Sequence, residues 1–423
     1  MGSARAILHE QPAVTDPDPR RSLVAVVDRA TAEVTVISGA DTDPRAQVLV
    51  RDGRRTCALV TLDGAGEAAE RGSAAHPDPA PLRGWQDGAG RDLAATVVVC
   101  TLGRNPLLRV TVAALLAQTH RRVEIIIVDN DPASGATRQL LDDHRDPRLR
   151  IVDEPHPGLS RARNAGVAAA TGEIIAFTDD DALPHPSWLA SLLDVFASAP
   201  PGEVGAVTGP AFAAELQSRS QRFFEARGGF PKQLEPVVWS LDDPSPQCAR
   251  FGARGEGGPL FPVATARVGA GVSMAFSRPA LAALGDFDVR LGAGTLTNGG
   301  EDLDAFARVL RAGLAIIYNP DAVVHHVHRR DMAGLEKQIH GNGTGMAALL
   351  TVSLLRRPKD LVVLLRRVPS ILSRVAPGTE RMQGNEDDVP GTLSHQEIRG
   401  FLRGPMLLIR EILRQRRAPE RPT

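Results

Sequence analysis

Four apolar runs in the middle of the chain constrain its fold more than any other feature of the sequence. Each run has the length of a buried strand, and helical spacing or a helix-capping residue separates most of them from the next. Strands that alternate with helices in this way form a parallel sheet through right-handed crossovers, so their carboxyl ends line one edge. The sequence therefore predicts an α/β domain. The four runs are residues 96–100, 123–128, 149–152 and 174–177.

Polar residues follow these runs at the edge where open α/β sheets bind ligands. The fourth run leads into three consecutive carboxylates, residues 179–181. Adjacent carboxylates repel one another unless a cation lies among them, and hard divalent cations take oxygen ligands and bridge to phosphates. The alternative is an acidic loop, or a helix N-terminus with an aspartate cap before Pro184. The other strand ends favour a metal site that carries a nucleotide diphosphate, because they place Thr101, Asp129 and Glu154 at the same edge.

Composition excludes several other functions. The chain has 423 residues, of which 43% are hydrophobic, enough for two or three domains with a sizeable core. Lys and Arg number 49 against 50 Asp and Glu, so no basic field favours nucleic acid, and the 4% of aromatic residues offers few stacking surfaces. Three scattered cysteines fit a reducing compartment. Residues 1–19 lack the apolar core of a secretory signal, and no apolar run could span a bilayer, so we expect a cytoplasmic protein.

The N-terminal part divides by composition into three segments that precede the α/β domain. We expect a flexible tail over residues 1–21. Residues 22–63 contain four short strand candidates and a hairpin signal, which predict a small β or α+β module without a catalytic constellation. Residues 64–94 have the composition of a linker, and the α/β domain should then extend over residues 95–331.

The C-terminal region, residues 332–423, is expected to be helical and basic, with disorder over residues 377–395. Apolar stretches within residues 349–374 are flanked by lysines and arginines. This pattern suits an interfacial helix that lies on anionic lipid, at the inner face of the plasma membrane. An ordinary helical subdomain with a solvated basic side explains it as well, and both interpretations stay open.

Five motifs, in the order in which they occur, resemble family 2 glycosyltransferases, and the resemblance covers residues 95 to 330. It implies an inverting enzyme with the GT-A fold, a Rossmann-like and mostly parallel sheet, which acts in cell-envelope or glycoconjugate biosynthesis. The donor would be a nucleoside-diphosphate sugar, with UDP favoured, and the acceptor a hydroxyl whose carrier the sequence does not indicate. Because the C-terminal region lacks the long membrane helices of processive synthases, we expect transfer of a single sugar. The motifs are Thr101 to Arg104 and residues 127–130, 158–166, 177–181 and 300–302.

The resemblance implies donor-binding roles for residues at the strand ends. Thr101, Arg104 and Asp129 match positions that hold the nucleotide, and the Asp129 carboxylate can accept a hydrogen bond from a uracil ring N–H. A turn residue after a strand is the alternative for Asp129. In the segment 158–166 we expect Arg161, rather than Arg163, to reach the donor or its neighbouring carboxylates.

The acidic triplet resembles the DxD motif of this family. Asp179 and Asp180 are expected on the donor side, with Asp179 at the ribose or sugar. Asp181 is expected to bind Mn²⁺ or Mg²⁺, which offsets charge on the diphosphate. His326 matches a further metal ligand of the family better than His325 or His328 does.

The resemblance also implies a general base far along the chain. Inverting transfer needs a group that takes a proton as the acceptor hydroxyl attacks the anomeric carbon. Asp302 is expected to be that base, and Glu301 to contact the acceptor or to serve as the base instead. Two acids that merely favour the N-terminus of a helix are the alternative interpretation.

Three other functions are weighed against this one. A catalytically silent scaffold that binds sugar nucleotides on the same fold is disfavoured by the intact acids at Asp181 and Asp302. A nucleotidyltransferase needs a glycine-rich loop with a cation after the first strand, where the chain offers only Gly103 and Arg104. A dinucleotide dehydrogenase needs G-x-G-x-x-G at that place, and it is absent from the sequence.

Overall fold

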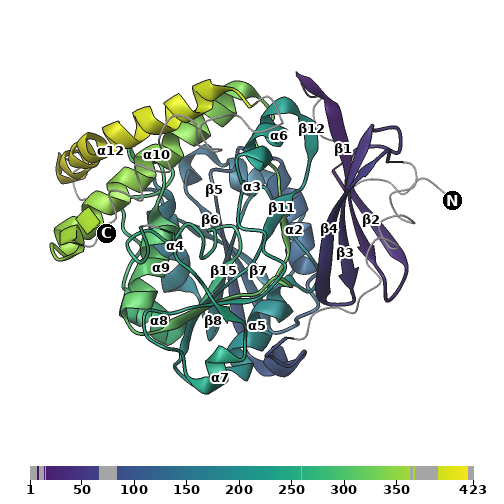
Figure 1. Ribbon diagram of the computed structural model, residues 1–423, viewed down its shortest axis with the longest axis horizontal. Coiled ribbons are helices and arrows are strands. Elements are labelled where there is room, and N and C mark those ends of the chain that lie inside the picture. Colours follow the sequence, from purple (N-terminus) through teal and green to yellow (C-terminus); the bar gives the residue numbers. More distant parts are fainter. Residues whose placement is uncertain are drawn as a thin grey trace.

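A nine-stranded sheet crosses the middle of the described part of the protein (Figure 1). The computed structural model describes residues 7–8, 14, 16–65, 83–258, 260–362, 365–366 and 389–417. Five of the eight strand pairings in this sheet are parallel, so it is mixed but mostly parallel, as predicted. The strand order is β14 (Ala253–Arg254), β13 (Val237–Trp239), β16 (Ala315–Tyr318), β10 (Val204–Thr208), β15 (Met274–Ser277), β8 (Ile174–Asp179), β5 (Ala95–Thr101), β6 (Val123–Asp129) and β7 (Leu149–Asp153).

The four predicted strands are confirmed as β5, β6, β7 and β8, and all are parallel neighbours. Their register pairs Thr101 with Asp129, and Cys100 with Asp179. The polar residue that ends each strand therefore lies at the same edge, as the alternation with helices requires.

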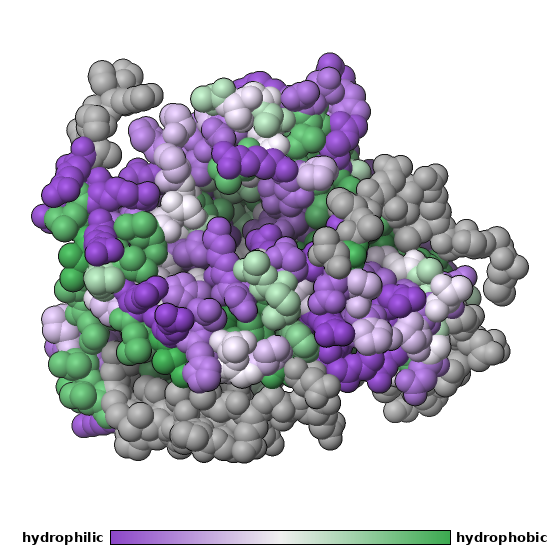
Figure 2. Space-filling model, turned by 90° about the horizontal axis from the view of Figure 1, so that it is seen from above, coloured by the Kyte–Doolittle hydropathy of each residue, from purple (hydrophilic) through white to green (hydrophobic). Residues whose placement is uncertain are grey.

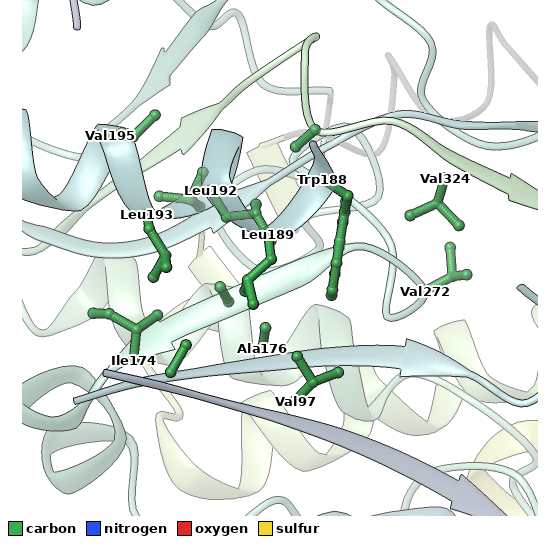
Figure 3. Packing of buried hydrophobic residues seen from close by; sticks show 14 of the residues in the cluster. Val97, Ile174, Ala176, Trp188, Leu189, Leu192, Leu193, Val195, Val272 and Val324 are labelled. Carbon is green, nitrogen blue, oxygen red and sulfur yellow. The ribbon is translucent and has the colours of Figure 1, made fainter. Parts of the chain in front are cut away.

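Helices cover both faces of the sheet because its strands bury alternate residues on opposite sides. Val97 and Val99 of β5 belong to the cluster under α2 and α5, whereas Val98 belongs to the cluster under α4, α8 and α9. In Figure 3, Trp188, the first residue of α5, stands over the sheet with the following leucines packed against Val97 and Ala176. The helices are α2 (Leu107–Leu116), α3 (Ala136–Leu140), α4 (Leu159–Ala169), α5 (Trp188–Ser198), α6 (Arg219–Ala226), α7 (Pro246–Ala249), α8 (Arg278–Leu284) and α9 (Glu301–Arg311), with short 3₁₀ helices η1 (Ala89–Asp92) and η2 (Pro132–Ser134).

A second sheet forms the N-terminal module, at the right in Figure 1. Its strands β1 (Pro17–Asp28), β2 (Glu33–Ser38), β3 (Arg45–Asp52) and β4 (Arg55–Asp63) confirm the four strand candidates, and β3 and β4 form the predicted hairpin. β1 begins inside the expected tail, of which residues 1–6, 9–13 and 15 lie outside the described residues. The edge strand of this sheet, β12 (Leu216–Ser218), comes from the α/β part of the chain and pairs with β1, so it joins the two parts.

The expected linker, residues 64–94, is described only at its two ends. Its C-terminal end is packed rather than free, since Trp85 is buried in the core and its ring meets Phe251 edge-on at 6.1 Å. Arg83 is also buried and pairs with Asp321 at 2.9 Å. These residues therefore anchor the module to the α/β domain.

Two long helices of the C-terminal region, α10 (Met332–Arg356) and α12 (Gly391–Arg417), lie side by side at the upper left of Figure 1. The expected disorder over residues 377–395 is wrong for 391–395, which are helical, and residues 377–388 lie outside the described residues. In the described part of the chain, every helix is too short or too polar to cross a membrane.

Candidate active site

A small sheet brings His326 to the acidic triplet. After the triplet, β9 (Ala182–Pro184) pairs antiparallel with β17 (Val324–His326), which in turn pairs with β11 (Ala211–Ala213). The register sets His326 opposite Ala182, so its Nε2 lies 3.0 Å from the Asp181 Oδ1. One atom each of Asp179, Asp181 and His326 lie within 4.8 Å of one another. Two carboxylates and an imidazole form a donor set that suits Mn²⁺ or Mg²⁺.

The carboxylates of the triplet are costly to ionise, because they are buried close to one another. Burial raises the pKa of the Asp179 carboxyl, which also lies close to the charge of Asp181. Burial and the neighbouring Asp181 likewise raise the pKa of Asp180 to about 7. Burial opposes ionisation of Asp181 as well, but the charge and hydrogen bond of His326 outweigh it, and the pKa of Asp181 falls below its ordinary value. A divalent ion here would relieve this repulsion.

His326 is oriented by a second row of side chains. Its Nδ1 lies 3.3 Å from Nδ1 of His328, whose Nε2 lies 2.8 Å from the Glu225 Oε1. Glu225 also pairs with Lys232 at 2.5 Å, and it stands on α6, which a capping box of Ser218 and Gln221 begins. Partners of this kind fix the ring orientation of metal-binding histidines.

The contact of His328 with His326 was not predicted from the sequence, although strand alternation could have indicated it. Residues 326 and 328 share one side of an extended chain, while residue 325 faces the other. His325 indeed packs against Phe212, with ring centroids 6.1 Å apart, and burial lowers its pKa to about 4. The contact between Glu225 and His328 could not be predicted from the sequence, because the two residues are 103 positions apart.

The predicted nucleotide side is formed by the ends of β5 and β6. The Thr101 hydroxyl donates to Asp180 Oδ2 at 2.5 Å and accepts from the Gly103 N–H at 3.0 Å. Asp129 is fully buried, and its Oδ1 accepts from the Asp131 N–H at 3.1 Å. Its Oδ2 has no hydrogen-bond partner within the described residues, but it forms an ion pair with Arg138, whose Nη1 lies 3.6 Å away. Arg104 extends outward, 72% exposed, and pairs with Asp131 at 2.8 Å.

Arg163, rather than the expected Arg161, lies between the acidic groups. Its side chain is 3% exposed; Nη1 donates to Glu301 Oε1 at 2.7 Å, and Nη2 lies 3.9 Å from Asp179 Oδ1. Arg161 is two residues away on α4, only partly buried, and therefore faces another direction. Gly166 could have indicated this choice from the sequence. Its missing Cβ lets α4 approach Val98, so the side of the helix that carries Gly166 and Arg163 faces the sheet.

Glu301 and Asp302 begin α9 beside this arginine. Burial and the charge of Asp302 raise the pKa of Glu301 to about 7. Asp302 Oδ2 accepts from the Gly271 N–H at 2.9 Å. A Cβ at residue 271 would lie 2.5 Å from Arg163 Nη2, so only glycine lets these groups meet. The guanidinium of Arg163 thus lies between Glu301 of the acid pair and Asp179 of the triplet, which are more than 100 residues apart in sequence.

A cavity of about 650 Å³ opens beside the acid pair. Glu301 and Asp302 line one side of it, and apolar residues that include Phe230 and Phe401 line others. The Phe230 ring also meets His326 edge-on, with centroids 5.3 Å apart. The cavity therefore lies beside the acid pair and is bordered by the ring that packs on His326, with room for a substrate.

Comparisons with known proteins agree with this geometry. Residues 96–251 match the family model described as glycosyl transferase family 2. The chain is 30% identical over 266 residues to succinoglycan biosynthesis protein ExoM of Rhizobium meliloti, a match that covers 60% of this chain and 74% of that protein. It is 27% identical over 293 residues to the pre-mycofactocin glycosyltransferase of Mycobacterium tuberculosis, covering 68% of this chain and 53% of the relative.

A solved mannosyltransferase from Pyrobaculum calidifontis, in complex with GDP-Man and Mn²⁺, gives a TM-score of 0.46 at 19% identity, over 78% of this chain and 91% of that one. The α/β domain has the GT-A fold, as predicted. The family match and the glycosyltransferase relatives identify it as a glycosyltransferase domain. The chain belongs to glycosyl transferase family 2.

Proposed function

We propose that this protein transfers a single sugar from a nucleoside-diphosphate sugar, with UDP as the first choice, to an acceptor hydroxyl with inversion at the anomeric carbon. The observation that carries this proposal is the position of Arg163 between Asp179 of the triplet and Glu301 of the acid pair. One bound sugar can then lie within reach of both acidic groups.

On the donor side, Asp181 and His326, with Asp179, would hold Mn²⁺ or Mg²⁺. When bound, the ion offsets negative charge on the diphosphate. The Asp129 carboxylate, which also pairs with Arg138, would accept the ring N–H of uracil, which GDP and dTDP donors would match in part. The Thr101 hydroxyl holds Asp180, which would face the donor, Asp179 would contact the ribose or sugar, and Arg104, which is largely exposed, would meet the nucleotide.

On the acceptor side, Asp302 would act as the general base. It lines the cavity, and the Gly271 N–H holds one of its oxygens in place. As the acceptor oxygen forms its bond to the anomeric carbon, its proton passes to Asp302 and the bond to the diphosphate breaks. Glu301 is held by Arg163 and would position the acceptor, or serve as the base if Asp302 does not.

The test is Asp302→Asn, assayed for transfer and for UDP binding by calorimetry with Mn²⁺. Removing the base should lower kcat by about 10²–10⁴-fold and leave UDP affinity unchanged. Asp304→Asn, on the same helix turn, is the matched control, since Asp304 pairs with Arg308 and Arg356 and should affect stability rather than kcat. A wild-type protein that binds donor without turning it over would instead favour a silent scaffold.

A thermal-shift screen of UDP-, GDP- and dTDP-sugars with Mn²⁺ would identify the donor. Stabilisation by a ligand grows with the ratio of its concentration to its Kd, so the true donor should give the largest shift.

A further inference from the structure

The outward face of α12 carries a continuous apolar stripe. Leu402, Met406, Ile409 and Leu413 follow one another at spacings of four, three and four residues, which places them on one side of the helix. They are 45% to 75% exposed, whereas the opposite side, with Leu393 and Leu408, is buried. We call these four residues the α12 stripe; none of them belongs to a hydrophobic core cluster of the described residues.

A row of arginines runs beside the α12 stripe. Neither carboxylate of the helix is exposed on this surface: Glu411 is fully buried and accepts from the Leu296 N–H at 3.1 Å and from Arg414 Nη2 at 2.8 Å, and Glu397 pairs with Arg227 at 2.6 Å. The helix has six arginines against two glutamates, and its exposed face is therefore strongly basic. The exposed arginines on one flank of the stripe are Arg399, Arg403, Arg410, Arg414 and Arg417.

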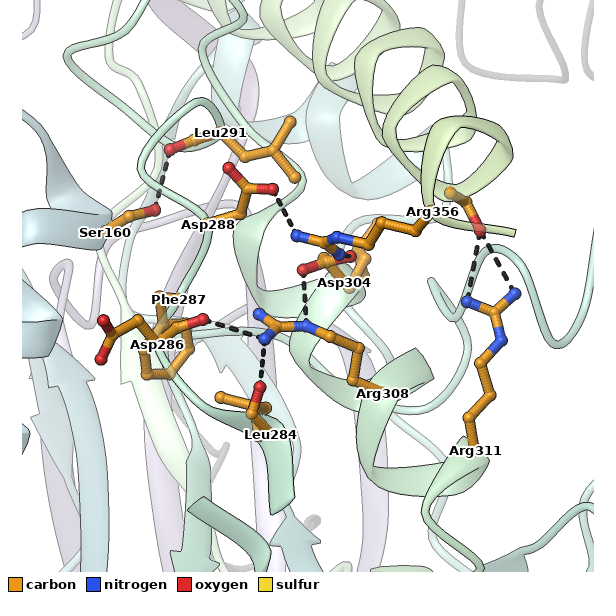
Figure 4. Close-up of polar contacts among 12 residues, drawn as sticks. Ser160, Leu284, Asp286, Phe287, Asp288, Leu291, Asp304, Arg308, Arg311 and Arg356 are labelled. Carbon is orange, nitrogen blue, oxygen red and sulfur yellow. Dashed lines mark hydrogen bonds and ion pairs between the residues drawn. The ribbon is translucent and has the colours of Figure 1, made fainter. Parts of the chain in front are cut away.

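The stripe is presented on a rigid support. A Cβ at Gly343 of α10 would lie 2.1 Å from the Glu397 carbonyl, and one at Gly400 of α12 would lie 2.1 Å from the His340 carbonyl, so glycines let the two helices pack closely. Figure 4 shows how α10 is tied to the α/β domain, where Arg356 pairs with Asp288 and Asp304.

A second apolar patch lies at the same end of the helix pair. Gly343 of α10 meets Glu397 of α12, and further along Val352 packs in one cluster with Leu408 and Ile412, so the two helices run in the same direction. Figure 2 shows hydrophobic and hydrophilic residues intermixed along the left side, where Figure 1 places these helix ends. Beyond Val352, the residues Leu355, Leu361, Val362 and Leu365 are 48% to 64% exposed, close in sequence to Arg357, Lys359 and Arg366.

We propose that the α12 stripe and its flanking arginines dock this protein on the surface of an anionic lipid bilayer. An interfacial helix lies in the membrane plane with its apolar side among the acyl chains and its cations at the headgroups, and α12 offers both along a stripe of about 16 Å. A second copy of the chain is a poorer occupant, because it would bring two rows of arginines together.

This docking surface adds α12 to the sequence hypothesis for residues 349–374, of which 363, 364 and 367–374 lie outside the described residues, and it does not depend on the proposed reaction. It still has a consequence for the site: Phe401, next to the stripe, lines the cavity that contains Asp302. Docking would therefore hold the cavity close to the headgroups.

The test is sedimentation of the full chain with vesicles of phosphatidylcholine, alone or mixed with phosphatidylglycerol. The wild type should bind only the anionic vesicles and should dissociate at high salt. Changing Arg399, Arg403 and Arg410 together to Gln should weaken binding about 100-fold, since each cation near an anionic surface contributes roughly a factor of five. Leu402→Ser with Ile409→Ser should also abolish binding. Arg91, Arg219 and Arg254, changed together to Gln, form the control and should bind as wild type, because they are exposed outside α12.

Absence of binding to anionic vesicles would overturn the proposal, as would equal binding by the α12 variants and the control. A dimer in analytical ultracentrifugation that the stripe variants dissolve would assign the face to self-association instead. Mn²⁺ affinity and the circular dichroism spectrum, unchanged in every variant, would show that lost vesicle binding is not due to misfolding.

Discussion

Replacing Arg163 by Met tests whether one buried cation joins the two acidic halves of the site. The side chain is 3% exposed and contacts Glu301, Asp179 and the rings of Phe177 and Phe287. Removing one partner of a buried ion pair costs about 3–5 kcal/mol, because the other charge stays buried without compensation. We expect Arg163→Met to lose this amount in urea unfolding followed by fluorescence of the three tryptophans, all of which are buried.

The loss should depend on pH in one direction. In the folded protein the pKa of Glu301 is about 7, above its ordinary value of 4.5, so stability falls as pH rises through this range and levels off above it. Without Arg163 the pKa rises further, and the variant continues to lose about 1.4 kcal/mol per pH unit where the wild type has levelled off. The deficit should therefore be about 1–2 kcal/mol near pH 6, where both forms keep the proton, and about 3–5 kcal/mol near pH 8.5.

Two further variants make the result specific. Arg161→Met, on the same helix but only partly buried, should change stability by less than about 0.5 kcal/mol. Adding Glu301→Gln to Arg163→Met should restore part of the loss, because it removes the uncompensated charge. The reasoning is refuted if Arg163→Met and Arg161→Met unfold alike, or if the deficit shrinks as pH rises.

Three other predictions concern the metal side. EDTA should abolish transfer and added Mn²⁺ or Mg²⁺ should restore it; full activity in chelator would contradict the metal assignment. Asp181→Ala should weaken UDP binding measured by calorimetry with Mn²⁺, and an unchanged affinity would show that the triplet does not carry the diphosphate. His328→Ala should lower Mn²⁺ affinity about 10–100-fold in electron paramagnetic resonance titrations, because His326 loses its orienting partner; equal affinities would make His328 merely structural.

The residues at the carboxyl-terminal edge of the sheet were predictable, because few folds satisfy the pattern of apolar runs that alternate with helices. Runs that are apolar on both faces, separated by helices, permit only parallel strands with their ends aligned. Thr101, Asp129 and Asp179 had to lie close together once the strands were known, and the register pairs them accordingly. The choice between Arg161 and Arg163 was also open to inference, since Gly166 fixes the phase of α4.

Contacts that join distant segments were not predictable. Glu225 is carried by α6, and its hydrogen bond to His328 depends on how that helix is placed against the end of β17. The cavity depends in the same way on Phe401 of α12, which comes within reach of α9 only after the C-terminal helices pack on the α/β domain. Neither relation leaves a spacing or a motif in the sequence.

The N-terminal module, to which the sequence assigned no role, supports both elements that orient His326. Its strand β1 pairs with β12, which leads directly into α6 and Glu225. At the other side, Asp321 precedes β17, accepts the Thr56 N–H at 2.7 Å and receives two hydrogen bonds from the buried Arg83. Breaking that ion pair would leave a buried carboxylate beside the strand that carries His326, at a cost of about 3–5 kcal/mol. The module therefore braces the two elements that position His326, and it contributes no residue of its own to the proposed metal site. For this reason no sequence motif indicated these contacts.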